Sequence, residues 1–263
     1  MKIARYLYRG HIRFGVLEDG VLHELERTPF TGMRRQGRTC RLEEAEILPP
    51  VYPQKIIAVG LNYRDHAEEL HMPIPDEPVL FMKPPSSLLA HGGEIVYPSM
   101  SRRVDYEAEL ALVCGRECRD VSPAEASSCI LGYTCGNDVT ARDLQAKDGQ
   151  WTRCKSFDTF CPLGPFIETE VDVQGLMVEL RLNGEVRQSS AATNMIFTPE
   201  ELLSFTSRIM TLYPGDVIMT GTPPGVGEMF PGDVVEVVIE GVSTLRNTVA
   251  SAARDDAAGA ERR

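Results

Sequence analysis

Glycine and proline interrupt this chain at short intervals, and that spacing constrains its fold more than any other feature. The 263 residues include 22 glycines and 18 prolines, and the pattern between them indicates many short strands and few helices. The strands do not alternate regularly with helices, as a doubly wound parallel sheet requires. The sequence also lacks the G-x-G-x-x-G and G-x-x-x-x-G-K-[ST] patterns of dinucleotide and nucleotide-phosphate sites. We therefore predict a mixed, β-rich α+β fold.

A proline-rich segment at 48–53 marks a boundary between two predicted parts. Before it, residues 2–25 alternate apolar and polar side chains around an Asp-Gly turn, as a β-hairpin does. We predict a small N-terminal β module at residues 1–50 and a larger C-terminal domain at 51–250. The last stretch, 251–263, is rich in Ala, Asp and Arg, and we expect a disordered tail there.

The charge balance and the cysteines exclude several classes of partner. The chain has 27 Lys and Arg against 38 Asp and Glu, a formal net charge of −11, so it lacks the basic surface that nucleic acid requires. Its seven cysteines form no C-x-x-C pair and are too few for a disulfide scaffold. We therefore expect reduced thiols and a cytoplasmic location. No apolar run approaches the ~20 residues of a membrane helix, so we expect no membrane partner.

Residues 105–113 contain three carboxylates at strand spacing, Asp105, Glu107 and Glu109. Because side chains alternate along a strand, Glu107 and Glu109 should point to the same face, roughly 6.5–7 Å apart. Two such carboxylates repel each other unless water or a cation separates them. From spacing alone, a solvated strand face and a buried metal site explain them about equally well.

Asp138 is a candidate for a third ligand of such a metal, although an aspartate in a loop more often caps a turn. Three carboxylates without histidine would suit Mg²⁺ or Mn²⁺. The argument therefore depends on whether the chain folds Asp138 against the two glutamates.

A second candidate site lies in the helix-compatible segment 62–70. On a helix, His66 and Glu69 stand at i and i+3 and are therefore neighbours. A carboxylate beside an imidazole fixes its tautomer, which is the arrangement that a general base needs. The spacing alone nevertheless favours a surface His–Glu pair without a catalytic role.

Two further features have structural interpretations. Arg142 and Asp143 are adjacent, and we expect them to form an ion pair. Trp151 is the only tryptophan, and we expect it to pack in the interior, with a place in the wall of a substrate pocket as the alternative.

These segments together resemble the fumarylacetoacetate hydrolase family. The similarity is strongest to bacterial members described as 2-hydroxyhepta-2,4-diene-1,7-dioate isomerases or acylpyruvate hydrolase-like proteins, which carry a short N-terminal β module like residues 1–50. The matching segments occur in order and span roughly residues 50 to 247, which is far more specific than any single motif. They are VGLNYRDHAEE (59–69), EPVLFMKP (77–84), DYEAE (105–109), GNDVTARDLQ (136–145), KSFDTF (155–160) and TGTPPGVG (220–227).

The resemblance implies a β-roll fold, a homodimer and a bound Mg²⁺ or Mn²⁺. It implies that the His–Glu pair lies on a segment that orders over the bound substrate. By residue, it implies cation ligands at Glu107, Glu109 and Asp138, catalytic groups at His66, Glu69 and Lys155, and substrate contacts at Gln145, Thr222, Lys83 and Arg64.

The implied substrates are 2-oxo or β-diketo acids, which chelate a cation through the carboxylate and the C2 oxygen. A cation-stabilised enolate serves hydrolytic C–C cleavage, isomerisation of a 2-hydroxy-dienedioate and, as an alternative, decarboxylation of an oxaloacetate-type acid. The motifs do not choose among these reactions. An alternative of another class is a metal-binding or scaffold protein without turnover. We expect the loops at 71–77 and 145–153 to shape the specificity of the pocket.

Overall fold

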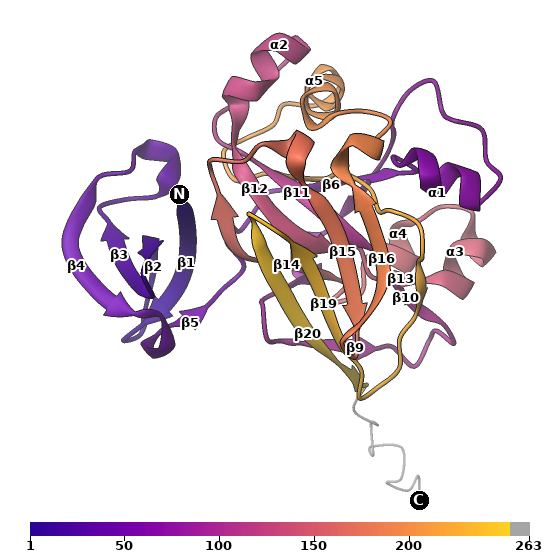
Figure 1. The fold of residues 1–263 in the computed structure, drawn as a ribbon, viewed down its shortest axis with the longest axis horizontal. Coiled ribbons are helices and arrows are strands. Elements are labelled where there is room, and N and C mark those ends of the chain that lie inside the picture. The colour runs from indigo at the N-terminus through magenta and orange to yellow at the C-terminus, as the bar shows by residue number, and fades with distance from the viewer. Residues whose placement is uncertain (253–263) are drawn as a thin grey trace, which may run out of the picture.

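Figure 1 shows a computed structural model of the chain, which describes residues 1–252. Most of the predicted tail, residues 253–263, lies outside the described residues, and Ser251 is the last residue of strand β20. A small lobe built from the N-terminal residues stands beside a larger body that holds most of the chain (Figure 1). Strands dominate both parts, and the helices lie around the larger body.

The largest sheet has 12 strands and runs through both parts. It crosses from the small lobe to the larger body where β1 pairs with β14, with Lys2 opposite Glu168 and Ile3 opposite Ile167. In spatial order the strands are β4 (Arg35–Arg41), β3 (Val21–Leu25), β2 (His11–Glu18), β1 (Lys2–Tyr8), β14 (Cys161–Glu168), β12 (Ile130–Asn137), β11 (Ala108–Cys114), β17 (Val217–Met219), β6 (Ile56–Gly60) and β7 (Val79–Lys83), with β5 (Glu46–Ile47) on β1 and β8 (Leu88–Leu89) on β14.

Two smaller sheets complete the larger body and confirm the predicted mixed, β-rich α+β fold. One has the order β16 (Glu185–Ala191), β15 (Met177–Leu182), β19 (Val234–Ile239), β20 (Ser243–Ser251) and β9 (Glu94–Tyr97), and the other β13 (Thr140–Ala141), β10 (Val104–Tyr106) and β18 (Gly227–Glu228). The α-helices are α1 (Arg64–Glu69), α2 (Pro123–Ala126), α3 (Arg142–Asp148), α4 (Thr152–Lys155) and α5 (Pro199–Ile209), and short 3-10 helices cover Pro29–Thr31, Leu42–Glu44, Pro85–Ser87, Ser127–Cys129, Val173–Gly175 and Ala192–Asn194.

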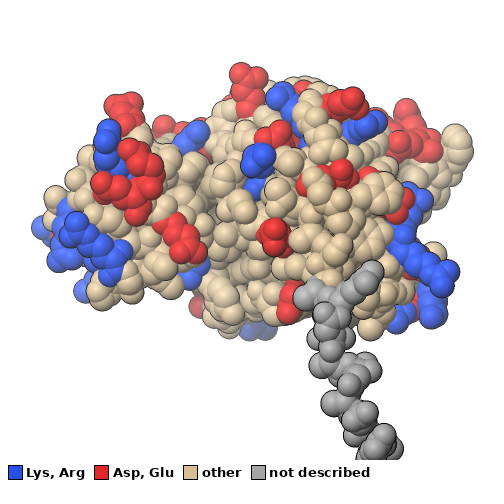
Figure 2. Space-filling model, turned by 90° about the horizontal axis from the view of Figure 1, so that it is seen from below, with Lys and Arg blue, Asp and Glu red and all other residues tan. Residues whose placement is uncertain are grey.

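Strand β4 has a sequence without a strand pattern, because it is an edge strand in the exposed lobe. Of its seven residues only Cys40 is buried, so no apolar alternation marks it. Two of its three arginines pair with carboxylates of neighbouring segments, Arg35 with Glu18 and Arg41 with Glu43. Figure 2 shows the basic side chains of this lobe next to acidic ones, so the basic charge here is balanced locally.

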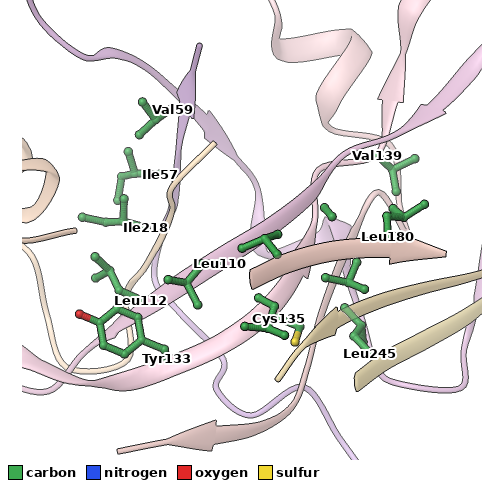
Figure 3. Packing of buried hydrophobic residues seen from close by; sticks show 14 of the residues in the cluster. Ile57, Val59, Leu110, Leu112, Tyr133, Cys135, Val139, Leu180, Ile218 and Leu245 are labelled. Carbon is green, nitrogen blue, oxygen red and sulfur yellow. The ribbon is translucent and has the colours of Figure 1, made fainter. Parts of the chain in front are cut away.

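The main core lies between the large sheet and the five-stranded sheet (Figure 3). Leu110 of β11 and Cys135 of β12 project from one sheet, and Leu180 of β15 and Leu245 of β20 from the other. The alternate residues of β11, such as Ala111, belong to a second cluster on its opposite face. Because every residue of β11 is buried, this strand is a rigid support for whatever lies at its end.

All seven cysteines are buried and free, as expected for reduced thiols that act as small apolar side chains. Hydrophobic burial rather than a disulfide framework therefore holds the described residues together. None of the helices in residues 1–252 is long and apolar enough to cross a membrane.

Candidate active site

Glu107, Glu109 and Asp138 converge at one end of β11 and β12. Ala108 pairs with Asn137 in the antiparallel register, so the residue before β11 and the residue after β12 are neighbours. One oxygen from each of the three carboxylates lies within 4.8 Å of the others. The strand pairing therefore brings the three candidate cation ligands together.

The chain reaches this arrangement by a different route from the predicted one. We expected one strand over 105–113, but the strand breaks at Glu107, with β10 in the three-stranded sheet and β11 in the large one. The Glu107 N–H donates to the Asn137 side chain at 2.9 Å. Glu107, Glu109 and Asp138 are only 7%, 1% and 1% exposed, so the alternative of a solvated strand face is wrong.

Cations contact two of the three carboxylates. The Lys155 ammonium donates to Glu107 at 2.9 Å and also to Asp138, and Lys83 donates to the other oxygen of Asp138. Arg142 donates to Glu107 as well. Burial alone would raise the pKa of Glu107, but the attraction of Lys155 and Arg142 prevails and lowers it to about 2.

Glu109 has the opposite environment. Its carboxylate accepts the Gly221 N–H at 2.7 Å, but burial, together with repulsion from Asp138 and Glu107, raises its pKa well above the ordinary value. Among the described residues no cation contacts Glu109, and a divalent cation would supply the positive charge that is missing there. Because all three ligands offer carboxylate oxygen, the residues present fit a hard cation such as Mg²⁺ or Mn²⁺.

A cavity of about 300 Å³ opens onto this cluster. Glu107 and Asp138 reach its wall, whereas Glu109 lies outside its lining among the described residues. The other polar lining residues are His66, Arg142, Gln145, Lys155 and Thr222, and the remaining ones are Val59, Gly60, Leu61, Leu70, Met72, Phe81 and Trp151. A ligand in this cavity would contact the carboxylate cluster and the candidate base together.

His66 and Glu69 lie on α1 and form the predicted pair. His66 Nδ1 is 2.9 Å from Glu69 Oε2, and Glu69 also accepts the Gly225 N–H at 3.1 Å. Asp65 holds the start of the helix, since its Oδ1 accepts the His66 N–H at 3.0 Å and its Oδ2 accepts the Ser190 hydroxyl. Because Nδ1 is engaged by Glu69, Nε2 is the ring nitrogen available to a ligand.

Two of the four implied substrate contacts line the cavity. Gln145 Oε1 accepts a hydrogen bond from Arg142 at 2.6 Å, and the Thr222 hydroxyl accepts one from Gln188 at 2.8 Å. Both side chains therefore line the cavity and are each fixed by a hydrogen bond to a neighbouring side chain.

The other two implied contacts, Lys83 and Arg64, lie elsewhere. Lys83 is fully buried and donates to Asp138, so it supports the carboxylate cluster and does not line the cavity. Arg64 donates to the Met195 carbonyl and lines a separate cavity. Arg64 stands two residues before His66 on α1, and residues two apart on a helix do not face each other.

Arg142 is a site residue that the sequence interpretation missed. We expected it to pair with Asp143, but it pairs with Asp105 at 2.8 Å and with Glu107. Asp143 instead accepts the Ser101 hydroxyl at 2.6 Å. The sequence did offer one signal. Arg142 lies in the segment 136–145 together with Asp138, a candidate cation ligand, and Gln145, an implied substrate contact.

Trp151 both packs against neighbours and lines the cavity, so both interpretations of it hold. Its ring meets that of Phe81 edge-on with centroids 5.1 Å apart. A Cβ on Gly60 would lie 2.6 Å from the same indole, so only glycine allows this close approach. The two segments expected to shape the pocket contribute Met72, Gln145 and Trp151 to its wall. The expectation of a loop at 145–153 was wrong, since most of it is helical, in α3 and α4.

Comparison with known families assigns both parts of the chain to known profiles. The profile of the fumarylacetoacetate (FAA) hydrolase C-terminal family matches residues 55–250, and the profile of the Rv2993c-like N-terminal family matches residues 1–50. The chain belongs to the fumarylacetoacetate hydrolase family. The resemblance inferred from the motifs is thereby confirmed.

Three relatives in the fumarylacetoacetate hydrolase family carry the names of different enzymes. Human mitochondrial oxaloacetate tautomerase FAHD2B is 42% identical over 259 residues, which cover 94% of this chain and 79% of that protein. The crystal structure of 5-carboxymethyl-2-hydroxymuconate delta-isomerase from Mycobacterium smegmatis is 42% identical with a TM-score of 0.91, and the match covers 96% of this chain and 100% of that one. Maleylpyruvate hydrolase from Sphingobium sp. SYK-6, in complex with manganese(II) and pyruvate, is 28% identical with a TM-score of 0.81 and the same coverage.

Proposed function

We propose that this protein is a Mg²⁺- or Mn²⁺-dependent enzyme that moves a proton at the carbon beside the oxo group of a 2-oxo acid, as an isomerase or tautomerase. One observation carries the proposal: a buried carboxylate triad, in which Glu109 has a raised pKa, adjoins a cavity that is also lined by His66, the imidazole of the His–Glu pair. Glu107, Glu109 and Asp138 would hold the cation. When bound, a divalent cation supplies positive charge that lowers the energy of an enolate oxygen.

The proton transfer falls to His66. Glu69 engages Nδ1, so Nε2 can take a proton from the substrate carbon and return it at another position. The tautomer and the ring orientation are both set by Glu69, which the Gly225 N–H holds in turn. The pair therefore has the geometry of a general base with its orienting group.

The charge of the site favours an anionic acid. Three carboxylates face three cations, Lys83, Lys155 and Arg142, so their formal charges balance before any cation binds. A divalent cation would leave the cluster positive, which attracts a carboxylate although the whole chain is acidic. Gln145 and Thr222 offer hydrogen bonds to the remaining substrate oxygens.

Hydrolytic C–C cleavage of an acylpyruvate-type acid is a second candidate reaction. The observation in its favour is that the maleylpyruvate hydrolase relative holds manganese(II) and pyruvate together, and pyruvate is what such a cleavage leaves behind. His66 would then activate water instead of taking a proton from carbon. Decarboxylation of an oxaloacetate-type acid would need the same stabilised enolate but no base at carbon.

The test compares these reactions on one preparation. Protein stripped with a chelator and reloaded with Mn²⁺ or Mg²⁺ is assayed with a 2-hydroxymuconate-type dienoate, with enol-oxaloacetate and with an acylpyruvate. We expect proton shift to be the fastest reaction and to need the cation. Full activity in chelator would contradict the proposal, and failure on all three acids despite a bound cation would favour the scaffold alternative.

The proposed partner is a small 2-oxo acid, and the proposed assembly is the homodimer that the resemblance implies. Light scattering should then report about twice the chain mass of 29.1 kDa. A monomer would remove the dimer from the proposal but would leave the site argument intact, because all its residues come from one chain.

A further inference from the structure

Strand β16 carries two buried polar side chains that the proposed chemistry does not use. Gln188 and Ser190 are 1% and 4% exposed, whereas Ser189 between them is exposed. β16 is an edge strand of the five-stranded sheet, and side chains two residues apart on a strand share a face. Both polar groups are therefore directed inward from one face of the same edge strand.

Gln188 joins two segments that carry site residues. Its Oε1 accepts the Ala108 N–H at 2.9 Å, and Ala108 lies between two of the proposed cation ligands. Its Nε2 donates to the Thr222 hydroxyl at 2.8 Å and to the Pro223 carbonyl at 2.7 Å. One buried amide thus uses both its ends to tie the cation-ligand strand to the loop at the cavity wall.

Ser190 makes the matching connection to the base. Its hydroxyl donates to Asp65 Oδ2, which also accepts from Asn194 at 3.1 Å. The other oxygen of Asp65 accepts the His66 N–H at 3.0 Å. The first turn of the base helix is therefore tied to the same strand as the cation-ligand segment.

The loop that contains Thr222 completes the connection between the two halves. The Gly221 N–H donates to Glu109 at 2.7 Å, and the Gly225 N–H donates to Glu69 at 3.1 Å. This loop lies directly against β16, because a Cβ on Gly225 would be 2.2 Å from the Arg187 carbonyl oxygen. A side chain there would push the loop off the strand, so only glycine fits.

We propose that Gln188 and Ser190 are positioning residues, through which β16 braces the His66–Glu69 pair against the cation ligands. The inference rests on the proposed function of this site. Helix α1 has only six residues and lacks a side-chain N-cap hydrogen bond, so it needs support from elsewhere to hold its imidazole in place. Satisfied, buried hydrogen bonds to one strand supply that support. Neither residue lines the cavity, so both act through others.

The test examines Gln188, which contacts the cation-ligand segment, separately from Ser190, which contacts the base helix through Asp65. Gln188→Met keeps the volume but removes both hydrogen-bonding ends, and we expect the Kd for Mn²⁺ to rise about 10-fold or more, with a higher KM. Ser190→Ala should leave the Kd for Mn²⁺ and the KM unchanged but lower kcat about 10-fold. Ser190→Thr, which keeps a hydroxyl, should recover most of that kcat. Ser189→Ala, on the same strand but exposed, is the matched control and should match the unmodified protein throughout.

The outcomes distinguish this inference from the proposed function. Mn²⁺ affinity is measured without any substrate, so Gln188→Met tests the brace even if the protein turns over no 2-oxo acid. A lack of turnover would contradict the proposed function and leave the brace untouched. Unchanged Mn²⁺ affinity in Gln188→Met, or a Ser190→Ala that behaves like Ser189→Ala, would overturn the brace. If Gln188→Met does not fold, Gln188→Glu keeps the acceptor for the Ala108 N–H and loses the donors. Its KM should rise, and an unchanged KM would overturn the brace.

Discussion

The two halves of the candidate site are built on different supports. The cation-ligand half stands on strands within the core, and Glu109 and Asp138 are each 1% exposed. The base half stands on a six-residue helix, and the Glu69 side chain is 43% exposed. The segment after that helix exposes Leu70 and Met72. The core therefore positions one half, whereas the other is held by the burial of His66 and Ala67 and by a few hydrogen bonds.

This difference has a consequence for motion. Segments with few buried contacts open at a lower free energy than core strands do. The carboxylates must stay close together to hold a cation, which demands a stiff support. By contrast, Leu70 and Met72, which are exposed and follow α1, line the cavity that a substrate would enter. We therefore expect α1 and the residues after it to open while the cation ligands stay in place.

The largest expected effect comes from a substitution in the cation-ligand half, which stands on the core strands. Glu109→Gln removes a ligand charge at nearly constant shape, so Mn²⁺ binding should be lost and activity should fall by about 10³-fold. In chelator, the melting temperature should be unchanged or higher, because a carboxyl repelled by its neighbours becomes a neutral amide. Calorimetric titration with Mn²⁺ and a thermal melt check both points. Normal Mn²⁺ binding in this variant would contradict the ligand assignment.

The next effect concerns the base half alone. His66→Ala should lower kcat by about 10²- to 10⁴-fold, the usual contribution of a general base. Mn²⁺ affinity should not change, because α1 carries none of the proposed cation ligands. Glu68→Gln, an exposed neighbour on the same helix, is the matched control. A loss of Mn²⁺ affinity in His66→Ala would show that the two halves are not separable.

The sequence was informative where the site is local and silent where it depends on the sheet register. The Glu107–Glu109 spacing and the His66–Glu69 spacing are short-range patterns, and the structure contains both pairs. The bond from Ala108 to Gln188 joins residues 80 apart, and no local pattern indicates it. The break at Glu107 also escaped prediction, because alternation describes side chains and not the sheet that each residue joins.

The misplacement of Arg64 and Lys83 has a different cause. Helix geometry alone argues against Arg64 and His66 facing one cavity, since they are two residues apart. For Lys83 the motif suggested proximity to the site correctly, but its ammonium binds Asp138 within the protein interior. Resemblance located these residues near the chemistry, and only the packing shows which atoms they contact.

A third prediction concerns how stability and Mn²⁺ affinity depend on pH, and it again tests the cation-ligand half. Without a cation, the pKa of Glu109 lies above its value in the unfolded chain, which is about 4.3 for a glutamate. The folded chain therefore holds an extra proton, and its stability in chelator should fall as pH rises from about 4.3 through the raised pKa. Cation binding expels this proton, so Mn²⁺ affinity should rise with pH, by up to about 10-fold per unit.

Titrations in two buffers of different ionisation enthalpy measure the released proton directly. Glu107, whose pKa is already low, should contribute no proton above about pH 4. Mn²⁺ affinity that is flat across this range, without proton release, would contradict the raised pKa of Glu109.

The smallest expected effect lies where the rigid strand β6 meets the cavity wall. Gly60→Ala places a Cβ 2.6 Å from the Trp151 ring, so the indole must shift, at a cost of about 1 kcal/mol. We expect the KM to rise about fivefold while Mn²⁺ affinity and kcat stay near normal. Trp151 is the only tryptophan, so its fluorescence reports the displacement directly. Gly175→Ala, which meets no atom closer than 4.0 Å, is the control. A fluorescence change without a change in KM would show that this wall does not touch the substrate.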